Sequence, residues 1–476
     1  MTKPNLFTVR WLISALVIMS FVLSACAAPA GDAGSGGNTA ASESSDSGDS
    51  GGEAMADVDM EELPYGLMSG KPYDGTELTF LICCPAAAQF AVWADSAAEF
   101  TELTGISVNF TNDPLGGLRE KIVTESLGNP GSWDVTIYFD TWGPSLAGFL
   151  DPIDSFMDVD VSDYPPATID IATLDDTLYG VPVRSHVMMF YYRQDVLDEL
   201  GIAPPTTFEE VTAAAEAISA ADNGMEGITM NWAKQGGGIS LIPWTNVLRA
   251  GGADMFDADF RPTFNSDAAI AATEWYANLL NYAPAAAPTY NEGDARTSYA
   301  SGEAAMVFAW SWAYEIFQKP DASIEEVIAN TGYTANFPDG GGGSAPVAMA
   351  WPTGISTSSK NKEAAVEWIK WMTNPDMDLQ AISVKDDPSR ATVVANRLSS
   401  LSSEAANAPE ANNGFSQAMH DAYSSATALP VYLEFPEVSE ILESALSEIA
   451  AGADVAETLN AAAEEVDQIM QDSGRY

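Results

Sequence analysis

The sequence has few basic residues, few cysteines and few histidines, and each shortage excludes a class of protein. Lys and Arg number 19 against 68 Asp and Glu, which gives the 476-residue chain a formal net charge of −49. A surface this negative repels phosphate backbones and anionic lipid headgroups, so nucleic acid is not an expected partner. Two interpretations of the acidic excess remain: a solvated surface for an exposed or saline environment, or an acidic cleft for a cationic ligand.

Motifs for metal binding and catalysis are equally scarce. The two histidines, His186 and His420, form no HExxH pattern, and the three cysteines fit neither a CxxC pair nor Cys/His metal spacing. We therefore expect no metal site, no cofactor and no framework held by disulfides. The chain has no Walker A run, and its one G-x-S-x-G match, at residues 48–52, lies in a Gly/Ser-rich segment instead of a strand-to-helix turn.

The N-terminus has the features of an export signal. Lys3 and Arg10 precede an apolar run from residue 11 to residue 25, which is shorter than the ~20 residues that span a bilayer comfortably. A basic start, a short apolar segment and small residues before a cleavage point are typical of a secretion signal. The sequence Leu-Ser-Ala-Cys at the end of the run resembles the lipobox of bacterial lipoproteins, which implies that residues 1–25 are removed and that Cys26 is acylated. The alternative is an ordinary signal peptide that is cleaved a few residues later.

Residues 26–74 are predicted to form a flexible tether. They are mostly Gly, Ser, Ala and Asp at their start and show no apolar periodicity. A segment of this composition cannot bury a core, but it is long enough to hold a domain away from a membrane.

A repeating β-α-β pattern follows the tether. Strands are predicted over residues 77–82, 106–110 and 133–139, with a helix between each pair, and Gly105 stands where the first helix should end. Strands separated by single helices predict a parallel sheet with right-handed crossovers. Further helices are predicted after the Pro204–Phe208 segment, which offers threonine caps, and on either side of Gly452 near the C-terminus.

Ligands of open α/β sheets bind beyond the carboxyl ends of the strands. In this sequence those ends carry the residues that we predict to contact ligand: Cys83, Cys84, Asp113, Asp140 and Trp142. The adjacent cysteines have two interpretations. They are either small buried thiols, or a vicinal disulfide favoured by an oxidising compartment and by the opposite directions of neighbouring side chains on an extended strand.

Aromatic residues are abundant enough to build a carbohydrate site. Sugars present apolar C–H faces and polar edges, so their sites need flat aromatic walls with polar side chains at the margins. Twelve tryptophans are present, and Trp232 and Trp244 flank a Gly-rich loop that could present both to a ligand. Trp93, Trp275 and Trp368 lie on apolar helical faces and are assigned to the core. His186 has two interpretations, and a structural histidine whose hydrogen bonds are satisfied within the protein is favoured over a ligand contact.

Several segments between about residues 77 and 470 together resemble a known family. In order they include EFTELTGISVNF, LYGVPVRSHVMMFYYRQDVLDELGI, SGEAAMVFAWSW, ISTSSKNKEAAVEWIKWM and DPSRATV. This order and spacing is similar to that of the extracellular solute-binding proteins of the sugar-binding family, which includes maltose- and multiple-sugar-binding lipoproteins. The resemblance implies an α/β, two-lobed periplasmic-binding-protein-like fold with a hinge and an interlobe ligand cleft. It places lobe 1 at residues 75–182 and 298–345, and lobe 2 at residues 183–297 and 346–476.

The resemblance also implies binding residues. Asp140 and Trp142 stand at a strand end that commonly touches ligand in this family, and the segment that lines the cleft contains Trp310 and Trp312. Trp351 and Arg390 match two further positions that are frequently near ligand. The sequence departs from the family pattern at Cys83–Pro85 and at AMAWPTG, which lie near the expected site and leave the ligand open.

The function implied is that of a lipid-anchored, extracytoplasmic substrate-binding component of an ABC importer, which is not an enzyme. It would capture a carbohydrate (a sugar, an oligosaccharide or a polyol) and deliver it to the permease subunits and their ATPase, as a monomer that touches the membrane only through its lipid. One alternative keeps the fold but binds a polyamine or another cation. Another is a secreted glycoside hydrolase, because 68 acidic residues could supply the two carboxylates that it needs.

Overall fold

The computed structural model describes residues 63–84, 88–221, 223–344, 346–382, 394–408, 414–430 and 432–476. The chain divides into two compact units, residues 1–58 and 59–476, and every described residue belongs to the second. The predicted signal peptide, Cys26 and most of the predicted tether lie outside the described residues, as does Arg390.

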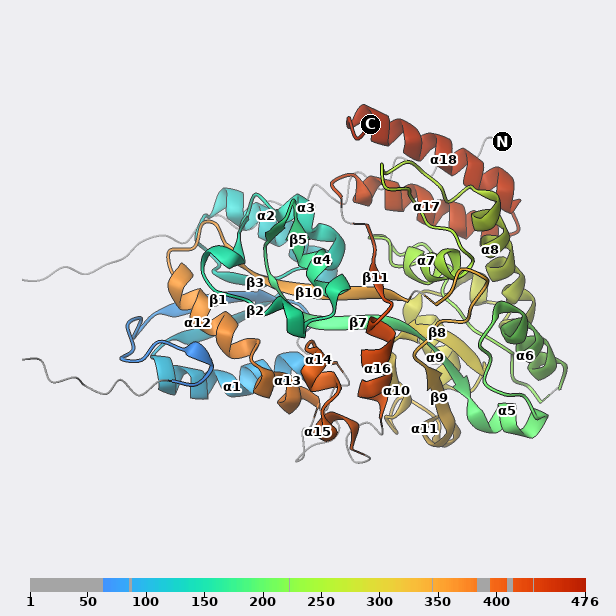
Figure 1. Ribbon diagram of the computed structural model, residues 1–476, viewed down its shortest axis with the longest axis horizontal. Coiled ribbons are helices and arrows are strands. Elements are labelled where there is room, and N and C mark those ends of the chain that lie inside the picture. The colour runs from blue at the N-terminus through green and yellow to red at the C-terminus, as the bar shows by residue number, and fades with distance from the viewer. Residues whose placement is uncertain are drawn as a thin grey trace, which may run out of the picture. The chain divides into compact units, whose positions relative to one another are not determined.

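A nine-stranded mixed sheet organises the described unit (Figure 1). Its main path runs in the order β2 (Ser107–Asn112), β1 (Glu77–Ile82), β3 (Val135–Ile137), β10 (Val347–Ser356), β7 (Val181–Arg193) and β8 (Met306–Trp310). Beside this path, β4 (Leu150–Asp151) and β11 (Thr427–Ala428) pair with β10, and β9 (Thr331–Thr334) pairs with β7. A separate two-stranded sheet consists of β5 (Thr173–Leu174) and β6 (Thr177–Leu178).

The first three strands confirm the predicted parallel β-α-β arrangement. β1 pairs in parallel with β2 on one side and with β3 on the other. The crossover helices are α1 (Ala88–Thr104) and α2 (Leu115–Gly128), which contact β2 and β1 and lie on opposite sides of these strands in Figure 1. Gly105 ends α1 with a φ of 76°, a left-handed conformation that glycine adopts without a steric penalty, as predicted.

Two long strands connect this parallel group to the rest of the sheet. Residues 181–187 of β7 pair antiparallel with β10, whereas residues 188–193 pair with β8 and β9. Residues 353–356 of β10 extend in the other direction and pair with β3 and β4. The segment 298–345, which was predicted in lobe 1, therefore contributes two strands that are hydrogen-bonded to β7 residues predicted in lobe 2.

Helices surround both parts of the sheet (Figure 1). Those near the β1–β3 strands are α3 (Gly143–Leu146), α4 (Pro166–Ala172), α12 (Lys362–Met372) and α13 (Pro375–Ile382). Those towards β8 and β9 are α5 (Gln194–Leu200), α6 (Phe208–Ala220), α7 (Leu241–Ala250), α8 (Asp267–Asn278), α9 (Glu292–Ala300), α10 (Ala313–Phe317) and α11 (Glu325–Asn330). The C-terminal part adds α14 (Leu398–Leu401), α15 (Glu404–Asn407), α16 (Phe415–Tyr423), α17 (Phe435–Ala450) and α18 (Val455–Asp472).

The predicted helix boundaries after the tether are largely confirmed. α6 begins after Thr207, whose side-chain oxygen accepts a hydrogen bond from the backbone N–H of Glu210 at 3.2 Å. This contact satisfies one of the N–H groups that a helix start leaves without a partner. Gly452, with a φ of 99°, lies between α17 and α18, where the sequence predicts a break.

Hydrophobic residues fill both sides of the sheet. On β7, Met188, Phe190 and Tyr192 belong to one buried cluster, and the alternating residues Val187, Met189 and Tyr191 belong to a second. Trp93 and Trp368 belong to the first cluster, which confirms their assignment to the core, whereas Trp275 is half-buried and stacks on the ring of Phe208.

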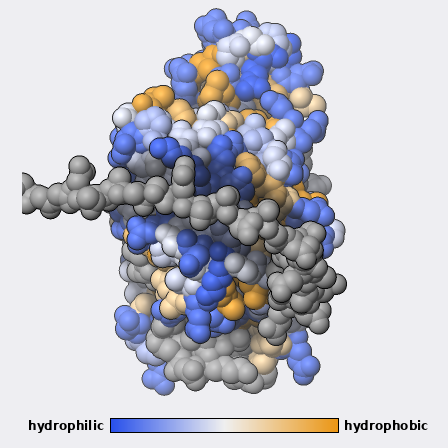
Figure 2. Space-filling view, turned by 90° about the vertical axis from the view of Figure 1, so that its left-hand side faces the viewer, coloured by the Kyte–Doolittle hydropathy of each residue, from blue (hydrophilic) through white to orange (hydrophobic). Residues whose placement is uncertain are grey.

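Figure 2 shows the face on the left-hand side of Figure 1, where hydrophilic side chains predominate and hydrophobic ones form small separate groups. This distribution agrees with the large excess of charged residues of one sign in the sequence. Within the described part of the chain, no helix is both long enough and apolar enough to cross a membrane.

Candidate functional site

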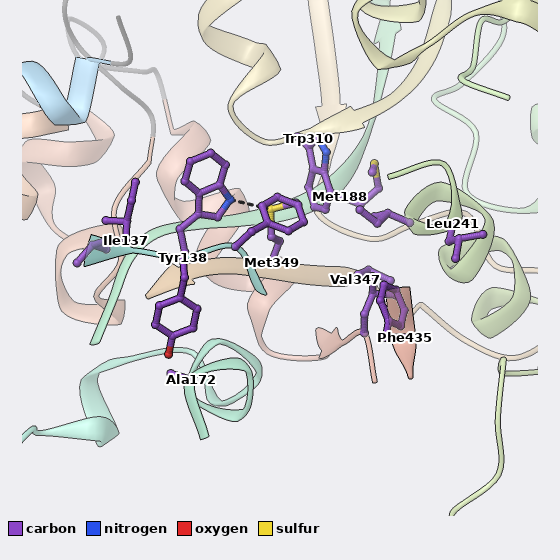
Figure 3. Packing of buried hydrophobic residues seen from close by; sticks show 14 of the residues in the cluster. Ile137, Tyr138, Ala172, Met188, Leu241, Trp310, Val347, Met349 and Phe435 are labelled. Carbon is purple, nitrogen blue, oxygen red and sulfur yellow. Dashed lines mark hydrogen bonds between the residues drawn. The ribbon is translucent and has the colours of Figure 1, made fainter. Parts of the chain in front are cut away.

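The candidate site is built on the sheet where β7 and β10 pair. Arg184 stands opposite Trp351 in this antiparallel register and His186 stands opposite Met349, while Met188 pairs with Trp310 of β8. Alternate residues of a strand point to the same side, so these side chains share one face of the sheet. Figure 3 shows Met188, Trp310 and Met349 close together on it. We call it the crossing face, defined by Arg184, His186, Met188, Trp310, Met349 and Trp351.

A row of aromatic rings joins the crossing face to the end of β3. The ring of Trp351 lies 6.5 Å from that of Phe90 and 5.7 Å from that of Phe139, between centroids. Phe139 in turn lies 5.8 Å from Trp142. The indole N–H of Trp351 donates to the sulfur of Met349 at 3.3 Å, the hydrogen bond drawn as a dashed line in Figure 3. Trp142 and Trp351, which are far apart in the sequence and both predicted to bind ligand, are thus brought into one aromatic group.

Arg184 is the cation of the crossing face, and the sequence analysis did not select it. Its guanidinium lies 4.8 Å from the ring centroid of Trp351 and 5.8 Å from that of Phe90. Among the described residues it makes no side-chain hydrogen bond and no ion pair. Burial lowers the pKa of Arg184, and the negative charge of Glu315 acts in the opposite direction.

The two cysteines lie next to this arginine. β1 ends at Ile82, and Cys84 has a φ of 55°, so the chain has left the extended conformation at this point. The two sulfur atoms are 2.7 Å apart, and both residues are free thiols in the structure. Our expectation that their side chains point in opposite directions is wrong, because it assumed an extended strand. The hydrogen bond between them raises the pKa of Cys83 and lowers that of Cys84, and the charge of Arg184 lowers both.

Asp140 begins the short turn that follows β3 and is 2% exposed. One of its carboxylate oxygens accepts a hydrogen bond from the backbone N–H of Thr141 at 2.7 Å. Burial disfavours the charged form and raises the pKa of Asp140 to about 7. The carboxyl group therefore exchanges protons near neutral pH and can either accept a hydrogen bond from a hydroxyl or donate one to it.

His186 is buried on the crossing face at 2% exposure, with its ring 6.3 Å from that of Trp310. Burial lowers the pKa of His186 well below its usual value, and the nearby Arg184 lowers it further, so the imidazole is neutral. Its Nδ1 atom has no hydrogen-bond partner among the described residues. The prediction of a satisfied structural histidine is therefore wrong for this nitrogen.

A second aromatic and polar group surrounds Trp312. The guanidinium of Arg296 lies 4.6 Å from the centroid of the Trp312 ring and donates to the carboxylate of Glu292 at 2.7 Å. The side-chain oxygen of Gln235 accepts a hydrogen bond from the backbone N–H of Glu292 at 3.4 Å. The Nε2 atom of Gln235 is buried and has no partner among the described residues. Sequence reasoning identified Trp312 but not the arginine on its face, because their contact depends on how α9 meets α10.

Trp232 and Trp244 belong to the core, and we remove them from the candidate site. Trp232 is 1% exposed and stacks on Tyr276 at a centroid distance of 4.4 Å. Trp244 is 0% exposed and donates its indole N–H to the side chain of Thr273 at 2.9 Å. The glycine loop between them predicted exposure, but partners from the distant helix α8 bury both rings.

Asp113 lies at the end of β2, adjacent to the end of β1, because its backbone N–H donates to the carbonyl of Ile82. Its carboxylate pairs with Lys121 of α2 at 3.2 Å, and no described contact joins it to the aromatic row. Within the described ranges, no cluster of three or more His, Cys, Asp or Glu side chains could hold a metal ion. The side chains that do converge are flat rings with polar groups beside them, an arrangement suited to noncovalent binding of a small molecule.

Comparison with known proteins defines the class. Residues 86–378 match the family model of bacterial extracellular solute-binding proteins, and the chain belongs to this family. Its members act outside the cytoplasm, and the relatives found are named as binding proteins, two of them of ABC transporters, and not as enzymes.

Two curated relatives show the range of ligands in that family. A probable amino-acid ABC transporter periplasmic-binding protein of Sinorhizobium fredii is 26% identical over 64% of this chain and 71% of its own length. The mannitol-binding protein of Pseudomonas aeruginosa is 25% identical over 54% of this chain and 60% of its own length.

Solved structures confirm the predicted fold. The maltose-bound MalE3 protein of T. maritima has a TM-score of 0.71 at 21% identity, over 83% of this chain and all of its own. A solute-binding protein of Agrobacterium radiobacter in complex with ribitol also has a TM-score of 0.71, at 23% identity, over 84% of this chain and all of its own. The fold is thus the two-lobed α/β fold of periplasmic binding proteins.

Proposed function

We propose that this protein is the substrate-binding component of an ABC importer and that it captures a carbohydrate on the crossing face. The observation that carries the proposal is the row of rings formed by Phe90, Trp351, Phe139 and Trp142, with Arg184 and Asp140 beside it. Flat rings complement the C–H faces of a sugar or polyol, and the charged side chains can bind its hydroxyl groups. The names of relatives support this ligand class, since they include proteins that bind mannitol, lactose and erythritol.

The two alternatives raised by the sequence are weaker. A polyamine would have to bind beside the positive charge of Arg184, which repels it. A glycoside hydrolase would need two carboxyl groups about 5–9.5 Å apart across the scissile bond. The family offers no support for that reading, because the relatives are transport proteins. The charge on the crossing face therefore favours a neutral or anionic ligand.

Ligand binding would shift the equilibrium between an open and a closed arrangement of the two lobes. We place the first lobe around β1–β4 with α1–α3, α12 and α13, and the second around β8, β9 and helices α5–α11, α17 and α18. This division follows strand pairing and differs from the one that the resemblance implied, because β8 and β9 pair with β7. β7 and β10 would then serve as the hinge, and a ligand that contacts both lobes would favour the closed state that a permease and its ATPase recognise.

Anchoring is proposed from the sequence. Cys26 would carry the lipid, and the Gly/Ser-rich segment up to about residue 74 would hold the binding unit away from the membrane. The protein would otherwise contact no membrane and would work as a monomer. We expect the wild-type protein to partition with host membranes and Cys26→Ser to be released or left unprocessed. A wild-type chain without lipid mass at its N-terminus would contradict the anchor.

The ligand class is tested by a thermal-shift screen of neutral sugars, polyols, sugar acids and polyamines against the mature protein. A ligand that binds only the native state adds RT ln(1 + [L]/Kd), which is about 2.7 kcal/mol at a hundredfold excess over Kd. We expect at least one carbohydrate to raise the melting temperature in a concentration-dependent way and polyamines to have no such effect. A response to polyamines alone, or release of reducing ends from an oligosaccharide, would overturn the proposal.

A further inference from the structure

We propose that the site selects a sugar acid, a carbohydrate that carries a carboxylate, and that the guanidinium of Arg184 binds this carboxylate. The inference deepens the proposed function and rests on it. It starts from a charge that the protein leaves without a partner on a face otherwise made of aromatic rings and methionines.

The other described arginines show how unusual this is. Five of them donate to a carboxylate within the chain, at distances between 2.6 and 3.2 Å: Arg193, Arg249, Arg296, Arg397 and Arg475. Arg119 donates to the hydroxyl of Ser145 at 3.1 Å, and Arg261 is exposed to solvent. Arg184 is half-buried, so water does not solvate it fully. It also has no hydrogen-bond acceptor among the described residues. A chain with 68 acidic residues has nevertheless placed none of the described carboxylates within ion-pair distance of it.

The groups that face Arg184 do not neutralise it. Its own face contributes the neutral His186 and the thioether of Met349, and the turn after β1 contributes two thiols. Glu315 on α10 is the carboxylate whose charge acts on Arg184, and none of the ion pairs of the described residues joins the two. A charge withdrawn from water without a partner is costly, and an anion that binds there removes the cost.

The geometry favours a carboxylate over other anions. Trp351 and Phe90 lie near the guanidinium at 4.8 and 5.8 Å, contacts that hold its plane in place. The planar fork of an arginine matches the two oxygens of a carboxylate in a bidentate pair. A phosphate monoester carries a charge of about −1.5 to −2 at neutral pH, which one arginine would not balance, and Glu315 would oppose the excess. The aromatic row beside Arg184 would then bind the C–H face of the sugar ring.

Matched ligand pairs test the selection by calorimetric titration of the mature protein. The pairs are galacturonate with galactose and gluconate with glucitol, and glucose 6-phosphate is compared with glucose. We expect wild type to bind at least one acid about tenfold or more tightly than its neutral partner, the range of one charge-assisted hydrogen bond. Arg184→Gln should remove this preference, because the acid loses more affinity than the neutral member does, while Arg184→Lys should retain part of the preference as a point charge. The exposed Arg261→Gln is the matched control and should behave as wild type.

Each other outcome counts against the inference. If wild type prefers the neutral members, or if Arg184→Gln binds the acid as wild type does, the carboxylate selection is wrong while the carbohydrate function stands. Preference for the sugar phosphate overturns the assignment of the anion. If no member of the panel binds while another, neutral carbohydrate raises the melting temperature in the thermal-shift screen, the inference fails and the proposed function stands. Should Arg184→Gln not fold, salt dependence of the wild type decides: the affinity for the acid should fall with ionic strength and that for the neutral partner should not.

Discussion

Two charged side chains of this protein, Glu443 and Arg184, differ in the number of hydrogen-bond partners that the fold gives them. Glu443 on α17 is 0% exposed and accepts hydrogen bonds from the backbone N–H groups of Gly236 and Ser240, at 2.9 and 3.1 Å, and from the Ser240 hydroxyl at 3.0 Å. Arg184 on β7 has ring contacts but no hydrogen-bond acceptor among the described residues. A buried charge with a complete set of partners fixes one structure, whereas an incomplete set remains available to a ligand.

The comparison extends to the regions around the two residues. Glu443 holds the start of α7 and the glycine loop, where residues 236–238 all have a positive φ, against α17. On the same face as Arg184, the Nδ1 atom of His186 is also unpaired among the described residues. At the end of β3, the Asp140 carboxylate accepts a hydrogen bond from a single described donor, the backbone N–H of Thr141. We infer that the Glu443 region contributes mainly to the free energy of unfolding, and the Arg184 region mainly to the free energy of binding.

The largest expected effect is on the Glu443 side of the comparison. Glu443→Ala would leave three donors without their acceptor, two of them on the backbone, and should lower the free energy of unfolding by about 3 kcal/mol or more. Urea denaturation measures it. The control is Glu440→Ala on the same helix, which removes only an exposed ion pair with Lys234 and should change stability by less than ~1 kcal/mol. Equal losses in the two variants would contradict a structural role for Glu443.

A smaller effect, confined to binding, is expected at Trp142 and Trp312. Trp142→Ala and Trp312→Ala should each weaken binding of the carbohydrate identified by screening, by about 0.5–1.5 kcal/mol or more, because a stacking surface is lost. Trp275→Ala is the control, since this half-buried ring stacks on Phe208 away from the site. Isothermal titration that gives the same affinity for all three variants and for wild type would place the site elsewhere.

The smallest effect concerns the pH dependence of stability. The folded-state pKa of Asp140 is about 7, above its ordinary value of 3.8, because burial penalises the charged form. Its contribution to stability is therefore complete below about pH 4 and is lost as the pH rises through about 7. Asp140→Asn removes this penalty and keeps an acceptor for the N–H of Thr141. The variant should gain stability relative to wild type at pH 8 but not at pH 4, and a difference that does not change with pH would reject the raised pKa.

Local sequence signals predicted much of the fold but less of the site. Gly105 and Thr207 predicted helix ends because the relevant contacts lie within a few residues. The parallel strands were predicted because single helices separate them in the sequence, which favours a crossover between parallel neighbours. Trp232 and Trp244 were misassigned because Tyr276 and Thr273, which cover them, come from another helix. The role proposed for Arg184 could not be predicted from the sequence, because it follows from the lack of a described hydrogen-bond acceptor near the guanidinium in the folded structure.

The division into lobes likewise depends on contacts that are distant in the sequence. Segment 298–345 carries no local signal for the partner of its strands, and only the structure shows that β8 and β9 pair with the second half of β7. Cys83 and Cys84 were placed at the site by the rule for strand ends, whereas their relative orientation depended on one left-handed residue. Long-range pairing and single backbone conformations are therefore the features that sequence patterns did not predict here.

The central claim is that a carbohydrate binds on the crossing face, and tryptophan fluorescence tests it most directly. Trp351 lies within the aromatic row, whereas Trp244, which is also buried, donates to Thr273 in the core. The ligand that stabilises wild type should change the fluorescence emission of wild type and of Trp244→Phe to a similar extent, and should change that of Trp351→Phe less, because Trp142 then remains as a reporter in the row. An emission change in Trp351→Phe as large as in wild type, at unchanged affinity, would contradict the account.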